Sequence, residues 1–99
     1  MNRPFYSEYV RHCLRFYARN IDKPRFNTEV DKNNWYACYK TIDRYSDREK
    51  DILIRVYALY DTIADNVYEV AKEYQIDQNN IWDLLKEVER GVAKRRGLL

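Results

Sequence analysis

The chain has 99 residues with 18 Lys and Arg against 16 Asp and Glu, a formal net charge of +2. This length suits one domain, and 24 residues are Leu, Ile, Val or Phe, which excludes an intrinsically disordered chain. Between Pro24 and Gly91 there is no glycine or proline, so few tight turns are available to a many-stranded sheet. No apolar run reaches the roughly 18 residues of a membrane span, and no signal-peptide segment is visible. We therefore expect a cytoplasmic protein without membrane contact.

The residues that carry chemistry in small enzymes and metal proteins are scarce. His12 is the only histidine, and Cys13 and Cys38 are far apart in the sequence, so the ligands of a zinc site are missing. Both cysteines lie among apolar residues and are expected as reduced thiols in the core. The chain has no glycine-rich phosphate loop and no nucleophile elbow. We expect no metal, no cofactor and no enzymatic activity.

Residues 4–19 carry the pattern of a first helix. Apolar side chains recur there at helical spacing on one face, which holds Tyr6, Tyr9, Val10, Cys13 and Tyr17. Asn20 and Pro24 are stop signals, so residues 20–27 form a linker. Thr28 suits the N-cap of a second helix. The predicted buried stripe of that helix consists of Trp35, Cys38, Tyr39, Ile42 and Tyr45.

Three further helices are predicted after residue 45. Ser46 and Glu49 have the spacing of a capping box, so the third helix begins near residue 47. Its expected inner face holds Ile52, Leu53, Val56, Tyr57, Leu59 and Tyr60. Residues 61–66 form a polar break before a fourth helix that reaches Gln75. The fifth keeps one phase through Gly91, which weakens it by about 1 kcal/mol without ending it. An all-α, five-helix bundle in a single domain, residues 1–99, is the predicted fold.

The last two helices have the pattern of a C-terminal helix-turn-helix. Such a motif needs a small residue where the helices touch and an apolar residue in the turn, and Ala71 and Ile76 meet these requirements. Ile81 and Leu84 face inward from the second helix. The turn position where glycine is usual is Gln75, which costs about 1 kcal/mol if left-handed. The alternative interpretation is an ordinary helical hairpin of a bundle.

The segment from residue 46 to 96 resembles the C-terminal, promoter-reading domain of bacterial sigma factors. It is also similar to small phage-encoded transcription regulators of the ArpU and RinA type. The resemblance covers about half of the chain, in the order leading helix, helix-turn-helix and basic C-terminal stretch. Residues 1–45, a predicted N-terminal helical pair, have no counterpart in it. The resemblance implies a DNA-binding transcription regulator that contacts double-stranded DNA.

The resemblance also implies that the second helix of the motif lies in the major groove. Its predicted DNA-facing residues are Gln78, Asn79, Trp82, Asp83 and Lys86. Phosphate contacts are predicted for two basic sets, Arg11, Arg15 and Arg19 in the first helix and Lys94, Arg95 and Arg96 at the C-terminus. The alternative for the polar residues is a solvated helix face. For the arginines it is a solvated stripe in which Glu8 pairs with Arg11.

Charge distribution keeps a second function open. Residues 61–99 carry six basic against eight acidic residues, a weak basic footprint for an autonomous DNA-binding protein. DNA binding is therefore expected to need a homodimer or RNA polymerase as partner. The acidic second half and the ten tyrosines also fit a helical protein–protein interaction module that does not bind nucleic acid.

Overall fold

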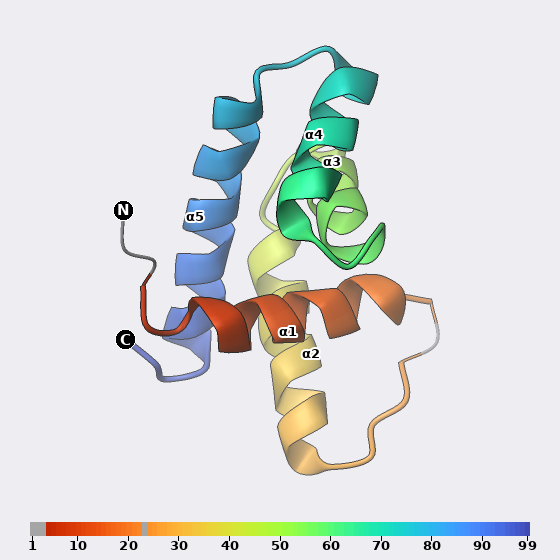
Figure 1. The fold of residues 1–99 in the computed structure, drawn as a ribbon. Coiled ribbons are helices and arrows are strands. Elements are labelled where there is room, and N and C mark those ends of the chain that lie inside the picture. The colour runs from red at the N-terminus through yellow and green to blue at the C-terminus, as the bar shows by residue number, and fades with distance from the viewer. Residues whose placement is uncertain (1–3, 23) are drawn as a thin grey trace.

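The computed structural model describes residues 4–22 and 24–99, and these form five α-helices and no strand. The helices are α1 (Ser7–Arg19), α2 (Glu29–Ile42), α3 (Asp47–Ala58), α4 (Ile63–Tyr74) and α5 (Gln78–Arg95). Figure 1 shows α1 lying across the other helices, which stand roughly upright in that view. The predicted all-α, five-helix fold is confirmed.

One hydrophobic core joins the two halves of the chain. The helix α1 packs against α2, α3 and α5, and α5 contacts all four other helices. Every helix contributes completely buried side chains, among them Leu14, Cys38, Val56, Val67 and Val88. The N-terminal helical pair therefore docks directly on the segment that begins at residue 46.

Two helices begin where their capping residues predict. The hydroxyl oxygen of Thr28 accepts a hydrogen bond from the backbone N–H of Asp31 at 3.1 Å, which starts α2. At the start of α3 the Ser46 hydroxyl accepts from the N–H of Glu49, and the Glu49 carboxylate accepts from the N–H of Ser46 at 3.1 Å. Both ends of this capping box satisfy backbone donors that a helix leaves free in its first turn.

The buried faces of α1 and α2 differ from prediction at two tyrosines. Tyr9 and Tyr39 are 42% and 43% exposed, although each was expected in a buried stripe. The core side of α1 is filled instead by Leu14, which is completely buried. The Tyr39 ring lies at the edge of the α2 contact, stacked on Trp35 with 5.5 Å between ring centroids. Helix α1 itself begins at Ser7, one turn later than expected.

The connection between α3 and α4 is earlier and shorter than predicted. Helix α3 ends at Ala58, so Leu59 and Tyr60 lie on the loop and are exposed rather than buried. Helix α4 begins at Ile63 and includes Asn66, so the predicted break at residues 61–66 is wrong for its last four residues. The side-chain amide of Asn66 is buried, accepts from the N–H of Tyr60 and donates to two carbonyl oxygens. A polar residue that looked like part of a loop thus anchors the loop from inside the helix.

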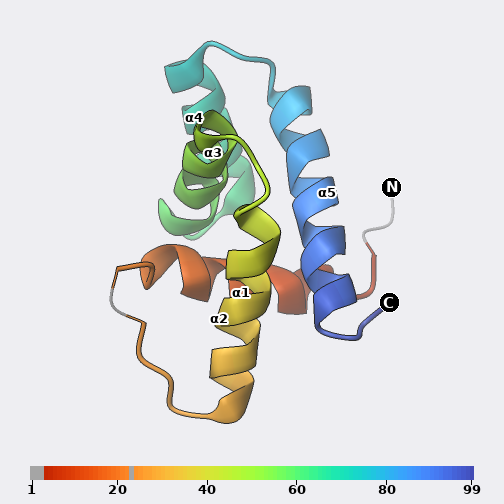
Figure 2. The same ribbon diagram turned by 180° about the vertical axis from the view of Figure 1, so that it is seen from behind.

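Helices α2 and α5 pack side by side in opposite directions (Figure 2). Thr41 faces Gly91 across this contact, and the Arg96 guanidinium donates to the Asn34 side-chain oxygen at 2.6 Å. A Cβ atom at Gly91 would lie 2.8 Å from the Thr41 methyl group. Gly91 therefore lets the two helices approach closely, and α5 continues through it to Arg95 as predicted.

Candidate nucleic-acid interface

The connection between α4 and α5 is a turn of three residues, 75–77. Gln75 adopts the left-handed conformation with φ 56° and ψ 48°, which costs a non-glycine residue about 1 kcal/mol. The N–H of Ile76 donates to the carbonyl of Ala71 at 3.0 Å and closes the end of α4. Asp77 caps α5 by accepting from the N–H of Asn79 at 2.8 Å. These contacts fix where α5 starts, and its first three residues, Gln78, Asn79 and Asn80, are exposed.

The exposed face of α5 begins with amides and continues with cations. Gln78 and Asn79 are exposed at its N-terminus and line an open groove together with Tyr68 and Lys72 of α4. Further along lie Lys86, Arg90 and Lys94, four residues apart and all exposed. We call these three the cationic row. Asn79 precedes Lys86 by seven residues, two helical turns, so it lies on the same face as the row.

The cationic row is free of direct ion pairs within the described ranges, residues 4–22 and 24–99. None of its three side chains forms an ion pair or a side-chain hydrogen bond there. Asp83 is exposed on the same stretch of α5. Arg90 is not among the residues predicted to bind DNA, although its spacing of four from both Lys86 and Lys94 is visible in the sequence.

Trp82 does not share this exposed face. Its ring is partly buried against the hydrophobic core, and the Arg11 guanidinium lies over it at 6.0 Å from the ring centroid. The contact with Arg11 shows that Trp82 faces α1. Trp82 is thus partly buried, whereas Gln78, Asn79 and Lys86, the other residues predicted to face DNA with it, are exposed.

Arg11 takes part in a buried polar network. Its guanidinium donates to the Glu89 carboxylate at 2.9 Å, and the Tyr57 hydroxyl donates to the same oxygen at 2.6 Å. Glu89 is 4% exposed and Tyr57 is completely buried. Burial raises the pKa of Tyr57 well above its usual value, and the adjacent Glu89 charge raises it further. The network joins α1, α3 and α5, so Arg11 is a structural residue here.

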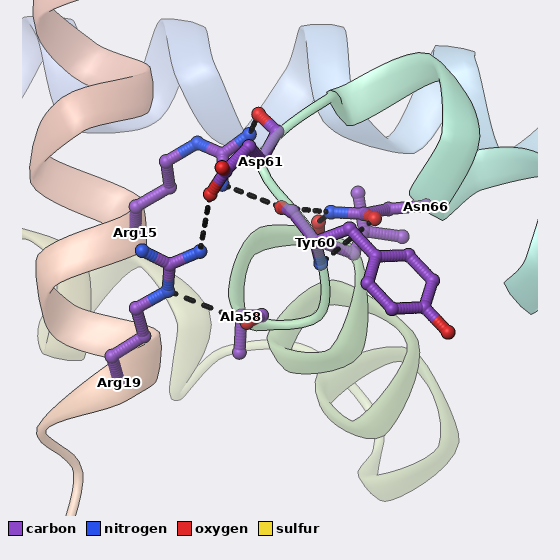
Figure 3. Close-up of polar contacts among 7 residues, drawn as sticks. Arg15, Arg19, Ala58, Tyr60, Asp61 and Asn66 are labelled. Atoms are coloured by element: carbon purple, nitrogen blue, oxygen red, sulfur yellow. Dashed lines mark hydrogen bonds and ion pairs between the residues drawn. The ribbon is translucent and has the colours of Figure 1, made fainter.

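Arg15 and Arg19 bind the loop that follows α3 (Figure 3). Arg15 donates to the carbonyl oxygens of Tyr60 and Asp61, and Arg19 donates to the carbonyl of Ala58 at 3.3 Å. The Arg19 guanidinium also pairs with the Asp61 carboxylate at 3.8 Å. The Ala58 carbonyl belongs to the last residue of α3, where cations are favoured. The three arginines of α1 thus form contacts within the fold and do not make a free phosphate-binding row.

The C-terminal cations divide into two groups. Arg96 is half-buried and bound to Asn34, whereas Lys94 and Arg95 are exposed. Lys94 and Arg95 line an open groove of about 480 Å³ between α2 and α5, together with Arg44 from the segment after α2. We call this the basic groove. No sequence signal pointed to Arg44, because its place beside Arg95 depends on how α2 packs on α5.

Aromatic side chains gather on α2 and the linker before it, where Tyr36 and Tyr39 are exposed and Phe26 is partly buried. Tyr36 and Tyr39 contact each other edge to face at 6.5 Å, and Phe26 lies 6.1 Å from Tyr36. Trp35 is 7% exposed and forms the base of this group through its stacking on Tyr39. We call Phe26, Tyr36 and Tyr39 the aromatic patch. It lies on the helical pair that has no counterpart in the sigma-like resemblance.

No protein-family model, curated protein or solved structure matches this chain. Within the described part of the chain, none of the helices has the length and apolar character needed to cross a membrane.

Proposed function

We propose that this chain binds double-stranded DNA and acts in the cytoplasm as a small transcription regulator of the sigma-like or phage-regulator type. The observation that carries the proposal is the exposed face of α5. Two amides at its capped N-terminus, Gln78 and Asn79, are followed by a row of three cations that form no ion pair with any described residue. This order of groups suits base contacts at one end of a helix and phosphate contacts along the rest.

The amides supply the sequence-reading chemistry in this proposal. A glutamine or asparagine amide offers one donor and one acceptor, which match the adenine edge in the major groove. Because Gln78 and Asn79 are exposed in the first turn of α5, they are free to approach a base edge. The left-handed Gln75 and the Asp77 cap hold this turn in place, as DNA-reading motifs require of their second helix.

The cationic row supplies the affinity. Helix α5 has 18 residues and is about 27 Å long, whereas the major groove is about 12 Å wide. An N-terminus seated in the groove therefore leaves the C-terminal half of α5 beside the sugar–phosphate backbone. Lys86, Arg90 and Lys94 would displace counterions there, which makes binding weaken steeply with salt.

The number of free cations on this face is small, and Asp83 lies among them. We therefore expect one protomer to bind weakly, and a homodimer or an RNA polymerase subunit to raise the affinity by adding contacts. Light scattering at the concentrations used for binding would show whether the chain associates with itself.

The proposal is tested by fluorescence anisotropy with a labelled duplex over a series of salt concentrations. A steep loss of affinity with salt is expected, after which a preferred site is selected from random duplexes. On that site Gln78→Ala/Asn79→Ala should bind at least about tenfold more weakly, since one bidentate base contact is worth about 1–3 kcal/mol. The matched control is Asn27→Ala/Asn33→Ala, which removes two exposed amides outside α5 and should leave binding unchanged.

Two results would contradict this proposal. The first is absence of duplex binding by the unmodified chain at low salt. The second is equal binding by the α5 variant and its control, which would remove the base-reading role from Gln78 and Asn79. Far-UV circular dichroism of each variant shows that a loss of binding does not reflect unfolding.

The aromatic patch favours a second candidate function, a protein–protein interaction module that does not bind nucleic acid. Tyrosine side chains are common at the centres of protein interfaces because they bury a large apolar area and keep a polar tip. A protein complex that persists at high salt and is lost in Tyr36→Ser/Tyr39→Ser, in a chain with no affinity for DNA, would establish this function instead.

A further inference from the structure

We propose that the basic groove between α2 and α5 binds a phosphate of the DNA backbone. This inference rests on the proposed function, which it extends to the side of α5 that faces α2. Three cations meet in the groove from two segments distant in the sequence, Arg44 after α2 and Lys94 and Arg95 at the end of α5.

The cations of the groove have no internal partner. Among the described residues, Arg44, Lys94 and Arg95 form no ion pair and no side-chain hydrogen bond. The arginines of α1 are the contrast, since all three donate to carboxylate or carbonyl oxygens of the fold. Removing any charge in the groove therefore costs the fold little, whereas a bound phosphate would accept several charge-assisted hydrogen bonds.

Two carboxylates also line the groove, and each accepts hydrogen bonds from an uncharged neighbour. Glu49 accepts from the N–H and the hydroxyl of Ser46 in the capping box of α3. Glu87 accepts from the Tyr45 hydroxyl at 3.0 Å. Burial raises the pKa of Tyr45, and the neighbouring carboxylate adds to the effect, so this hydroxyl keeps its proton as a donor. The groove keeps a net positive charge with three cations against two carboxylates.

The shape of the groove depends on Gly91. Because a Cβ atom at this position would press on the Thr41 methyl group, glycine allows α2 and α5 to lie close together beneath the groove. That approach brings Arg44 beside the last turn of α5. The position of the groove is thus a product of helix packing and not of a local sequence motif.

A DNA strand fits this arrangement better than a small isolated anion. Lys94 belongs both to the groove and to the cationic row, so the positive charge continues from the groove along α5 through Arg90 to Lys86. Cations four residues apart on a helix are spaced about 6 Å along its axis. A small anion would occupy the groove alone, whereas a polyanion can use the groove and the row together.

The test compares two double variants in the salt titration with a labelled duplex. Arg44→Gln/Arg95→Gln removes two groove charges and leaves Lys94 and the cationic row intact. The slope of log affinity against log salt should be less steep by about 1.8 in this variant. Between 50 and 200 mM salt, its affinity should therefore fall by a factor about twelvefold smaller than the affinity of the unmodified chain. The control, Arg25→Gln/Lys32→Gln, removes two exposed charges outside the groove and should keep the original slope.

A second measurement locates the contact by NMR. The chain has only two glycines, so the amide signal of Gly91 is readily identified and reports on the groove. Addition of duplex should shift it in the unmodified chain and leave it in place in Arg44→Gln/Arg95→Gln. Inorganic phosphate alone serves as the probe for a small anion, and saturation of the Gly91 shift by phosphate without any shift by duplex would overturn the assignment to DNA.

The two proposals fail in distinguishable ways. Salt-dependent duplex binding with an unchanged slope in Arg44→Gln/Arg95→Gln would refute the groove and leave DNA binding by α5 intact. Absence of duplex binding in the unmodified chain would refute both. A shallower slope in the groove variant together with loss of the Gly91 shift, against an unchanged control, would support the groove as a phosphate site.

Discussion

Substitution of Gly91 by alanine is predicted to destabilise this protein, although alanine is the better helix former. Position 91 is inside α5, and replacing glycine by alanine in a helix interior gains about 1 kcal/mol. The added Cβ atom would lie 2.8 Å from Cγ2 of Thr41, closer than carbon atoms approach without repulsion.

Thr41 has little freedom to move away from this contact. It is buried, its side chain is β-branched, and its hydroxyl donates to the carbonyl of Ala37 at 2.7 Å. Extra atoms in a well-packed core cost about 1–3 kcal/mol. We therefore expect Gly91→Ala to lower the free energy of unfolding by about 1 kcal/mol after the gain in helix propensity is included.

The variant Thr41→Ser separates the two effects. Serine keeps the hydroxyl and lacks the methyl group, and the other Thr41 atoms near the added Cβ lie at 3.9 and 4.0 Å, which is ordinary contact. Thr41→Ser alone should cost about 0.8 kcal/mol for the lost methyl group. In that background Gly91→Ala should stabilise by about 1 kcal/mol, so the coupling between the two positions is about 2 kcal/mol.

The assay is urea unfolding of the unmodified chain, Gly91→Ala, Thr41→Ser and the double variant, followed by circular dichroism at 222 nm. Free energies of unfolding come from linear extrapolation, and equal m-values test whether the four chains share a common unfolded state. The reasoning is refuted if Gly91→Ala raises the free energy of unfolding by about 1 kcal/mol in both backgrounds, because position 91 would then behave as an open helix surface.

Three further predictions concern charge and protonation. Glu89→Ala should lower the free energy of unfolding by about 3–5 kcal/mol, because it leaves the half-buried Arg11 charge unpaired. The control Glu87→Ala, on the exposed face of α5, should lower it by less than about 1 kcal/mol. Equal urea midpoints of the two variants would contradict this prediction. Burial raises the pKa of Cys13 from 9.0 to about 11, so unfolding releases its proton above pH 9 and stability falls as pH rises. Between about pH 8 and pH 10 the free energy of unfolding of Cys13→Ala should fall by about 1 kcal/mol less than that of the unmodified chain. Identical pH dependence in both chains would contradict the raised pKa of Cys13. If α5 faces DNA, Asp83→Asn should tighten duplex binding about fivefold at low salt, corresponding to about 1 kcal/mol of removed repulsion, and an unchanged Kd would place Asp83 away from the phosphates.

Local sequence determined the five helices and the beginnings of α2, α3 and α5. Apolar spacing of 3.6 residues and the capping side chains of Thr28, Ser46 and Asp77 act within one or two turns, so they can be read without knowing the fold. The three-residue turn was predicted for the same reason, and Gln75 takes the left-handed conformation that the turn requires.

The tertiary structure decided how each helix face is used. Periodicity identifies an apolar face but not its edges, and Tyr9 and Tyr39 lie beyond the edges set by neighbouring helices. Spacing of four residues identified an arginine row in α1, yet its partners come from the loop after α3 and from Glu89 in α5.

Part of the candidate site follows from the sequence, and the rest depends on how the helices pack. Gln78, Asn79 and Lys86 could be proposed from sequence because a helix face follows from residue number. The basic groove could not, because Arg44 and Arg95 are 51 positions apart in the sequence and meet only where α2 packs on α5. The role of Gly91 also differs between the sequence and the fold. In sequence it is a weak point of a helix, and in the fold it is the position that lets two helices touch, since contact between distant segments depends on the shape of both.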